Sequence, residues 1–162
     1  MLSTLKKMID AQASYDQKVL AKFDTSYEEI LAKHGYFFAI LDEFGEWNHT
    51  RKARWGWWQV HKDEPSREME LEEFADILHF CISHDIAIRG HAMKGHELAP
   101  QGINGIEDGI SKIMSYLESG YSLTLTDVLL DIGQAAGYSM DEIFEAYMAK
   151  NKINRERLEN GY

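Results

Sequence analysis

Hydrophobic residues recur at steps of three and four along most of this chain. This spacing gathers side chains on one face of an α-helix and is the main sequence signal for helical structure. Near the N-terminus, Leu5, Ile9 and Val19 follow it and predict a first helix over residues 3–23. Only the short segment 121–125 alternates as a β-strand would. The pattern therefore predicts an all-α protein.

Capping residues and glycines indicate where the later helices begin and end. Ser26 with Glu29, and Ser139 with Glu142, have the spacing of a capping box at a helix N-terminus. The elements predicted after the first helix are a helix over 27–52, a loop over 53–66, a helix over 67–89, an irregular segment over 91–105, a helix over 106–118, a helix capped by Thr124 or Thr126 that ends at Gly137, and a last helix that begins near Met140 and fades through the polar tail 150–162. Together they predict one domain spanning residues 1–162, an all-α helical bundle.

Composition narrows the class of protein. With 162 residues, of which 44% are hydrophobic, the chain is long enough to bury a core as one domain. Its net charge of −10 argues against a basic surface that holds nucleic acid, so no nucleic-acid partner is expected. The single cysteine, Cys81, fits a small core residue in a reducing setting, and we expect a cytoplasmic protein. No apolar segment is long enough for a membrane span, and none reads as a signal peptide, so no membrane partner is expected.

Two pairs of acidic residues stand at helical spacing in the middle of the chain: Glu43 with Glu46, and Glu73 with Asp76. Residues three apart lie on the same helix face, so each pair places two like charges side by side, which costs stability. Such pairs are common on solvated faces, but here apolar residues are interleaved with the acids, which indicates helices that are mostly buried. A divalent cation would offset the cost, because carboxylate oxygens are the ligands that Mg²⁺ and Mn²⁺ prefer.

The two predicted helices that carry these pairs are joined by a short connection, so we expect them to pack as antiparallel neighbours. Four carboxylates would then converge, with Asp42, Glu70 and Glu72 near them. Without metal, such a cluster would have raised pKa values. With two Mg²⁺ ions it becomes a site for phosphoryl chemistry, in which the metals polarise phosphate oxygens and generate a nucleophilic water.

The polar C-terminal tail carries four basic residues, Lys150, Lys152, Arg155 and Arg157. A metal–phosphate site needs cationic side chains, and these residues are candidates to supply them. The structural alternative is that they only complement the dipole at the C-terminus of a helix. The sequence leaves both interpretations open.

Three tryptophans and one histidine near the acidic pairs also have more than one interpretation. Trp55, Trp57 and Trp58 lie in the predicted loop and either cap the core, form an oligomer interface or stack on a nucleobase. His79 lies one helical turn after Asp76 and is either a metal ligand, a hydrogen-bond partner of a ligand, or a satisfied core residue.

The order of these features resembles the all-α nucleoside triphosphate pyrophosphohydrolases, which include the MazG-type enzymes and the all-α dUTPases. The superfamily's metal signature is matched by Glu43-x-x-Glu46, a tryptophan-bearing loop, and Glu73-x-x-Asp76. The dUTPase branch is favoured by the position of Trp57, by Gln12 with Asp16 on the first helix, by the run Asp76-Ile77-Leu78-His79-Phe80, and by the tail Lys150-Asn151-x-x-Asn154-x-x-Arg157-x-x-Asn160-Gly161-Tyr162. Residues 91–138 contain no matching motif.

The resemblance implies a reaction and a set of roles. The chain would hydrolyse dUTP, with dUDP as a second candidate substrate, to dUMP and pyrophosphate by a metal-activated water. Mg²⁺ would be the cofactor, with Mn²⁺ as an alternative. The fold would be a helical bundle with a four-helix metal-binding core, and a homodimer would complete each site. The implied metal ligands are Glu43, Glu46, Glu73 and Asp76, and among these carboxylates Glu46, then Glu43, is the candidate to orient or deprotonate the water. The implied substrate contacts are Lys150, Asn154, Arg157 and Tyr162 for phosphates and sugar, and Gln12, Asp16 and Trp57 near the base.

Three alternatives remain at this level. A MazG-type enzyme would share the metal site but prefer other bases or accept several. A di-iron oxidoreductase in a four-helix bundle would need two Glu-x-x-His motifs, and the chain offers only Asp76-x-x-His79 beside its acidic pairs. An acidic interaction module would use the tryptophans as its contact surface and would not depend on the carboxylates.

Overall fold

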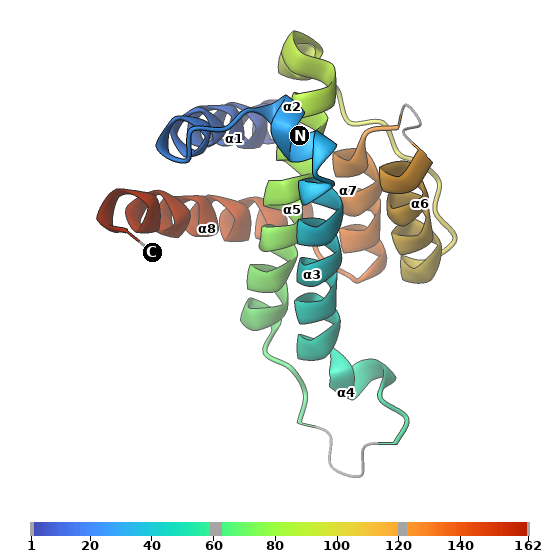
Figure 1. Cartoon of the computed structure of the whole chain (residues 1–162). Helices are drawn as coiled ribbons and strands as arrows, with labels where there is room; N and C mark the ends of the chain where they lie inside the picture. The colour runs from blue at the N-terminus through green and yellow to red at the C-terminus, as the bar shows by residue number, and fades with distance from the viewer. Residues whose placement is uncertain (1, 59–62, 120–122, 162) are drawn as a thin grey trace.

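The structure, a computed structural model, describes residues 2–58, 63–119 and 123–161, and no residue in these ranges is in a β-strand (Figure 1). This confirms the all-α prediction. Among the described residues, no helix is both long and apolar enough to cross a membrane. The elements are α1 (Leu2–Lys22), α2 (Tyr27–Ala32), α3 (Gly35–Thr50), α4 (Lys52–Trp55), α5 (Arg67–Arg89), the 3₁₀ helix η1 (Gly90–Gly95), α6 (Ile106–Ser119), α7 (Leu125–Ala135) and α8 (Met140–Asn160).

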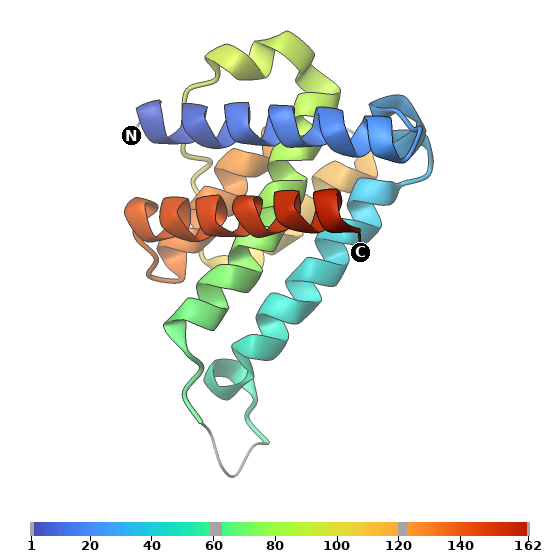
Figure 2. The ribbon, with the colours of Figure 1, turned by 90° about the vertical axis from the view of Figure 1, so that its left-hand side faces the viewer.

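Helices α3 and α5 form an antiparallel hairpin, as the short connection between the acidic segments predicts (Figures 1 and 2). The end of this hairpin, with α4, extends away from the other helices. Helices α1 and α8 lie side by side across α5 and run in the same direction (Figure 2). Tyr147 donates a hydrogen bond to the carbonyl of Met8, and near the other end Lys22 donates to the carbonyl of Leu158. The space between the hairpin and the α1–α8 pair is where the candidate site forms.

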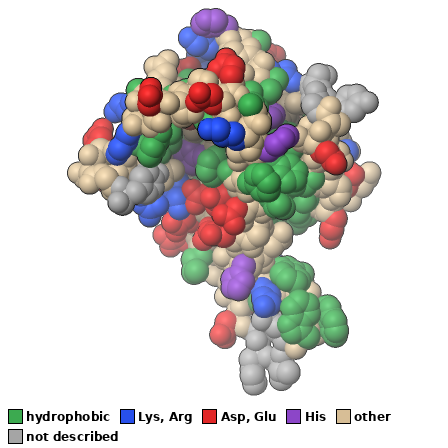
Figure 3. Space-filling view, in the orientation of Figure 1, with side chains coloured by type: hydrophobic (Ala, Val, Ile, Leu, Met, Phe, Trp, Pro, Cys, Tyr) green, Lys and Arg blue, Asp and Glu red, His purple; other side chains and the backbone are tan. Residues whose placement is uncertain are grey.

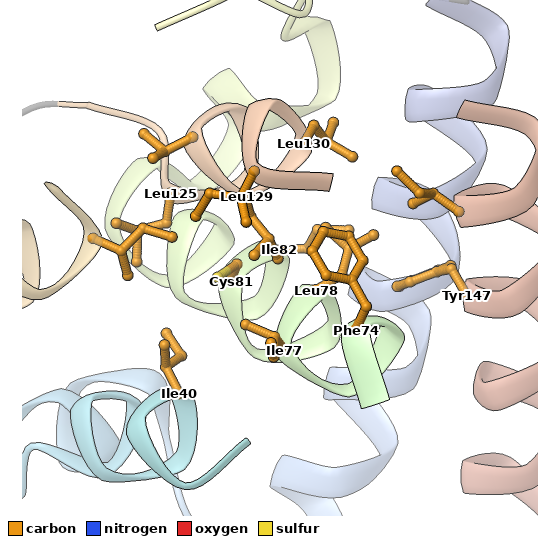
Figure 4. Close-up of a cluster of buried hydrophobic side chains, with 14 of the residues drawn as sticks. Ile40, Phe74, Ile77, Leu78, Cys81, Ile82, Leu125, Leu129, Leu130 and Tyr147 are labelled. Carbon is orange, nitrogen blue, oxygen red and sulfur yellow. The ribbon is translucent and has the colours of Figure 1, made fainter. Parts of the chain in front are cut away.

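Helix α5 is the centre of the hydrophobic core. Unlike a surface helix, it has no wide polar face in its second half, because neighbouring helices cover it on several sides. Figure 4 shows its side chains meeting those of α3, α7 and α8. The labelled core residues are Ile40 from α3, Phe74, Ile77, Leu78, Cys81 and Ile82 from α5, Leu125, Leu129 and Leu130 from α7, and Tyr147 from α8. Cys81 is fully buried, as the core interpretation of this residue predicts.

The helix predicted over residues 27–52 is wrong in one respect, because the chain breaks it into α2 and α3. His34 has φ 56°, in the left-handed region, where it cannot continue a right-handed helix. Gly35 follows it, and a Cβ there would lie 2.8 Å from Ile30 Cγ2, so the turn also needs a residue without a side chain. The break lets α2 fold back towards α1 and places Tyr27 at the candidate site.

The remaining boundaries differ from the predictions by little, with two exceptions. The predicted loop over 53–66 begins inside the short helix α4. The last helix does not fade after Lys150 but continues to Asn160, so the polar tail is helical over most of its length. Ser139 and Glu142 form the predicted capping box at its N-terminus, and Ser26 accepts a hydrogen bond from the Glu29 amide at the start of α2.

Carboxylates of α7 bind the segment 91–105, which was predicted to be irregular. His96 Nε2 lies 2.9 Å from Asp127 Oδ1, and the amide of Gln101 donates to Asp131 at 2.6 Å. From the other side, the buried Asp85 on α5 accepts from the Thr126 amide at 2.8 Å. The first two contacts hold the segment against α7, and the third holds α7 against α5.

Candidate active site

A cavity of about 570 Å³ opens between the α3–α5 hairpin, α1, α2 and α8. This volume is in the range of pockets that bind small ligands. Carboxylates lie at one end, and buried polar and aromatic side chains line the other. Of the residues that the sequence singles out, the lining includes Gln12, Asp16, Glu43, Glu46, Glu73, Asp76, His79, Lys150, Asn154 and Arg157.

The four predicted metal ligands line this one cavity. Glu43, Glu73 and Asp76 are half-buried, and one oxygen from each lies within 4.8 Å of the others. Glu46 lines the same cavity but lies outside this close group and is more exposed. Helical spacing places each pair on one face, and the packing of α3 against α5 brings the two faces together. Figure 3 shows acidic side chains gathered between α8 and the hairpin.

The acidic group holds negative charge that the protein does not fully neutralise. Burial, together with the charges of Asp76 and Glu46, raises the pKa of Glu43 to about 7. Burial also raises the pKa of Glu73 and that of Asp76, although a hydrogen bond from Lys150 opposes the shift at Asp76. Converging carboxylate oxygens with uncompensated charge suit a hard divalent cation such as Mg²⁺ or Mn²⁺. The residues present therefore fit the metal that the sequence predicts.

Glu70 does not belong to the acidic group, although it lies one turn before Glu73. It is fully buried and accepts hydrogen bonds from Arg54 at 2.7 Å and from the Tyr138 hydroxyl at 2.7 Å. Arg51 Nε lies 3.4 Å from its other oxygen. The expectation that Glu70 lies near the metal site is wrong, because basic residues that follow α3 pair with it towards the connected end of the hairpin.

Lys150, Asn154 and Arg157 lie on successive turns of α8 and line the cavity. Lys150 Nζ is 2.6 Å from Asp76 Oδ2 and 3.1 Å from Glu72 Oε1, so it is already engaged with the acidic end. Since α8 continues to Asn160, Lys150 is not at a helix end, and the dipole interpretation does not account for it. Tyr162 lies outside the described residues.

The other basic residues of the tail do not enter the cavity lining. Arg155 donates to the carbonyl of Ala11 at 2.8 Å and to Asn151 Oδ1 at 2.7 Å, and it thereby ties α8 to α1. Lys152 is exposed. The spacing alone could not separate these two from Lys150 and Arg157, because the side on which α8 packs decides which residues face the site.

Gln12 and Asp16 are buried at the polar end of the cavity, and Gln12 Nε2 donates to Asp16 Oδ1 at 2.7 Å. His79 is buried beside them, with Nδ1 2.6 Å from Gln12 Oε1. Burial lowers its pKa to about 3, so the ring is neutral. His79 is thus a hydrogen-bonded core residue outside the acidic group, which also argues against the di-iron interpretation.

Sequence reasoning missed four polar residues at this end of the site. Ser83 and Tyr27 donate to Asp16 Oδ2 at 2.8 and 2.9 Å, Tyr36 contacts Ser83 at 2.9 Å, and Tyr147 donates to Gln12. Ser83 follows His79 by one turn, and His79 interrupts the apolar run 77–82, so this pair of polar positions was the available signal. The tyrosines come from three other helices and gave none.

Trp57 is not part of the cavity within one chain. It lies at the end of the hairpin and is 85% exposed, and the rings of Trp55 and Trp57 both meet Trp58 edge to face. Trp55 and Trp58 are about half exposed. The interpretation of these residues as core caps is therefore wrong, and an interface or a stacking surface remains.

Comparison with known proteins adds one finding to this geometry. A family model described as dUTPase matches residues 4–162, which include every element from α2 to α8 and nearly all of α1. The match also covers residues 91–138, where the sequence offered no motif. No curated protein matches the chain.

Proposed function

Because the chain belongs to the dUTPase family, and is thus a nucleotide pyrophosphohydrolase, we propose that it hydrolyses dUTP to dUMP and pyrophosphate at this cavity with a bound Mg²⁺. The observation that carries the proposal is how charged and uncharged polar side chains are distributed along the cavity. Carboxylates and cationic side chains stand at one end, and buried hydrogen-bonding groups stand at the other. A nucleoside triphosphate has the same polarity, with a charged polyphosphate at one end and a base at the other.

The metal would be held by Glu43, Glu73 and Asp76, with Glu46 as a further ligand, and Mn²⁺ is an alternative ion. A bound divalent cation supplies charge neutralisation at the phosphates and lowers the pKa of water. Glu46 is our first candidate to orient the attacking water and take its proton, because it lines the cavity outside the close group of three. Glu43 is the second candidate, since a pKa of about 7 suits a group that exchanges protons near neutral pH.

The substrate would lie along α8 and α1. Lys150 and Arg157 would pair with phosphate oxygens, and Asn154, between them on the same face, would donate to phosphate or sugar. Gln12 and Asp16 would contact the base, because both line the cavity away from the carboxylates of α3 and α5. Tyr162 would add a contact from beyond the end of α8. dUDP is a second candidate substrate, since it offers the same base and one phosphate fewer.

We also propose that two copies of the chain form a dimer through the outer face of α3 and the hairpin end. Phe38 and Leu41 lie on one face of α3 and are 62% and 47% exposed. Together with the exposed Trp55, Trp57 and Trp58 at the hairpin end, they form an apolar surface of the kind that is typical of an interface. In this arrangement Trp57 of each chain would reach the cavity of its partner. Trp57 could then contact the base although it is exposed in the single chain.

A nucleotide panel tests the proposed reaction. Pyrophosphate and phosphate release is measured from dUTP, dUDP, dTTP, dCTP and UTP, first with Mg²⁺ and then with EDTA. The proposal predicts metal-dependent turnover with a strong preference for dUTP. Equal turnover of several triphosphates would instead assign a MazG-type activity of broad specificity. Turnover that persists in EDTA would contradict the metal site.

A further inference from the structure

Gln12 is the point at which two chains of hydrogen bonds meet. It is 3% exposed, and its side chain contacts three partners. Its Nε2 donates to Asp16 Oδ1 at 2.7 Å, while its Oε1 accepts from the Tyr147 hydroxyl at 2.7 Å and lies 2.6 Å from His79 Nδ1. The nitrogen and the oxygen of a buried amide can exchange places by a flip of the side chain. The neighbours of Gln12 therefore have to decide which end donates and which end accepts.

Asp16 fixes the first end. Its Oδ2 accepts from Ser83 at 2.8 Å and from Tyr27 at 2.9 Å, so it is the terminal acceptor of the network. Because Ser83 donates its single hydroxyl hydrogen to Asp16, the hydroxyl of Tyr36, 2.9 Å away, donates to Ser83. Two donors therefore bind one oxygen of the Asp16 carboxylate, and its other oxygen can only accept, so the amide nitrogen of Gln12, not its oxygen, must face it.

His79 fixes the second end. With the nitrogen of Gln12 turned to Asp16, its oxygen faces the imidazole, and the short contact requires a hydrogen on Nδ1. Burial lowers the pKa of His79 to about 3, so the ring carries one hydrogen at neutral pH, and that hydrogen is on Nδ1. The ring stacks on Tyr147 with centroids 4.2 Å apart, which holds its plane. Tyr147 donates to the same oxygen, so the Gln12 oxygen is saturated by two donors from inside the protein.

We propose that His79 is a positioning residue that acts through Gln12 to make the base end of the cavity a hydrogen-bond donor. The Gln12 amide nitrogen has two hydrogens, and Asp16 takes one. The second hydrogen is left to donate to a ligand, whereas the Gln12 oxygen already accepts from His79 and Tyr147 and is not available to one. The ligand group recognised there is a carbonyl oxygen of a pyrimidine. This inference rests on the proposed function, because it takes the base to bind beside Gln12.

Two substitutions separate this positioning role from a general structural one. His79→Phe keeps a flat ring against Tyr147 but removes the N–H. His79→Asn places an amide N–H close to where Nδ1 stands and so keeps the donor. We expect His79→Phe to raise the KM for dUTP roughly five- to tenfold, the effect of one lost hydrogen bond, with kcat little changed. His79→Asn should recover most of that loss.

Inorganic pyrophosphate provides the matched probe, because it binds the phosphate end and has no base. Its inhibition constant should be the same in the wild type and in both variants. A His79→Phe protein with wild-type KM would overturn the inference, and so would equal losses for dUTP and pyrophosphate or an Asn variant no better than the Phe variant.

The tautomer of His79 can also be read in the unmodified protein, which removes any dependence on how the variants fold. Long-range ¹H–¹⁵N NMR of the imidazole should show Nδ1 protonated and Nε2 unprotonated between pH 6 and 8. A ring protonated on Nε2 would overturn the inference whatever the kinetics show. If the wild type does not hydrolyse dUTP, the proposed function fails, and the tautomer measurement still decides the His79–Gln12 relation.

Discussion

Lys150 Nζ lies 2.6 Å from Asp76 Oδ2, so a proposed phosphate-binding residue on α8 is paired with a proposed metal ligand on α5. The lysine also contacts Glu72 at 3.1 Å, and its side chain is only 10% exposed. Without metal, this ammonium group is the nearest counter-charge to the acidic end of the cavity. Metal and lysine therefore compete electrostatically for the same carboxylates, and substrate phosphate gives Lys150 another partner.

Replacing Lys150 by methionine should separate these two effects. We expect Lys150→Met to bind Mn²⁺ about three- to tenfold more tightly in the absence of nucleotide, because a nearby positive charge is removed. The KM for dUTP should rise at the same time, because a phosphate partner is lost. Calorimetric titration with Mn²⁺ and steady-state kinetics measure the two quantities. Lys152→Met is the control, since Lys152 is exposed and should change neither. Weaker Mn²⁺ binding in Lys150→Met would contradict the competition.

Metal affinity should depend on pH through Glu43. The pKa of this carboxyl is raised to about 7, so it is mostly protonated at pH 6 and mostly ionised at pH 8. A proton on a ligand competes with metal, so affinity falls as pH falls. From this one group, Mn²⁺ should bind about tenfold more weakly at pH 6 than at pH 8. Glu43→Gln should weaken binding and remove most of this dependence. Equal affinity of the wild type at both pH values would argue against Glu43 as a ligand.

The buried Glu70 should matter for stability and not for metal binding. Glu70→Ala leaves the buried Arg51 without its carboxylate, and breaking such a pair costs about 3–5 kcal/mol. Urea denaturation would show this as a lower free energy of unfolding. The exposed Glu68, in the first turn of the same helix, is the control, and Glu68→Ala should cost roughly 0.5 kcal/mol or less. A Glu70→Ala protein as stable as the Glu68→Ala protein would show that the network contributes little.

A charge on the outer face of α3 tests the proposed dimer. Phe38→Glu places a carboxylate in the centre of that face and should yield monomers in sedimentation velocity, because an unpaired charge in an interface is costly. Lys33→Glu, at an exposed position on the preceding helix end, should leave the mass unchanged. Unaltered association in Phe38→Glu, or a wild type that is already monomeric, would rule out this interface.

The acidic pairs show how far helical spacing alone can predict a site. Positions 43, 46, 73 and 76 line one cavity, as their spacing and the short connection predict. Glu70 follows the same spacing, but Arg51 and Arg54 neutralise it, and this pairing depends on how the chain turns after α3. Local periodicity therefore identifies the face of a helix, whereas partners on other helices decide which of its charges remain free.

The same limit explains the missed break and the missed polar network. His34 carries no sequence signal for the left-handed region, although Gly35 beside it is a residue that disfavours a helix interior. His79 and Ser83 are polar positions in and next to the apolar run 77–82. Their partners, Gln12, Asp16 and Tyr36, come from α1 and α3, so their role depends on how these helices pack. Trp57 was expected near the base, but its distance from the cavity follows from the length of the hairpin.

The most direct test of the metal centre is the rate of pyrophosphate release from dUTP by Glu73→Gln at saturating Mg²⁺. Glu73→Gln has nearly the same size as the wild type and removes one negative oxygen from the group of three. We predict that turnover falls by roughly 100-fold or more while helicity by circular dichroism is unchanged. Glu68→Gln, on the same helix but outside the cavity, should keep the wild-type rate. A Glu73→Gln enzyme that releases pyrophosphate at nearly the wild-type rate would contradict the assignment of this carboxylate group as the catalytic metal site.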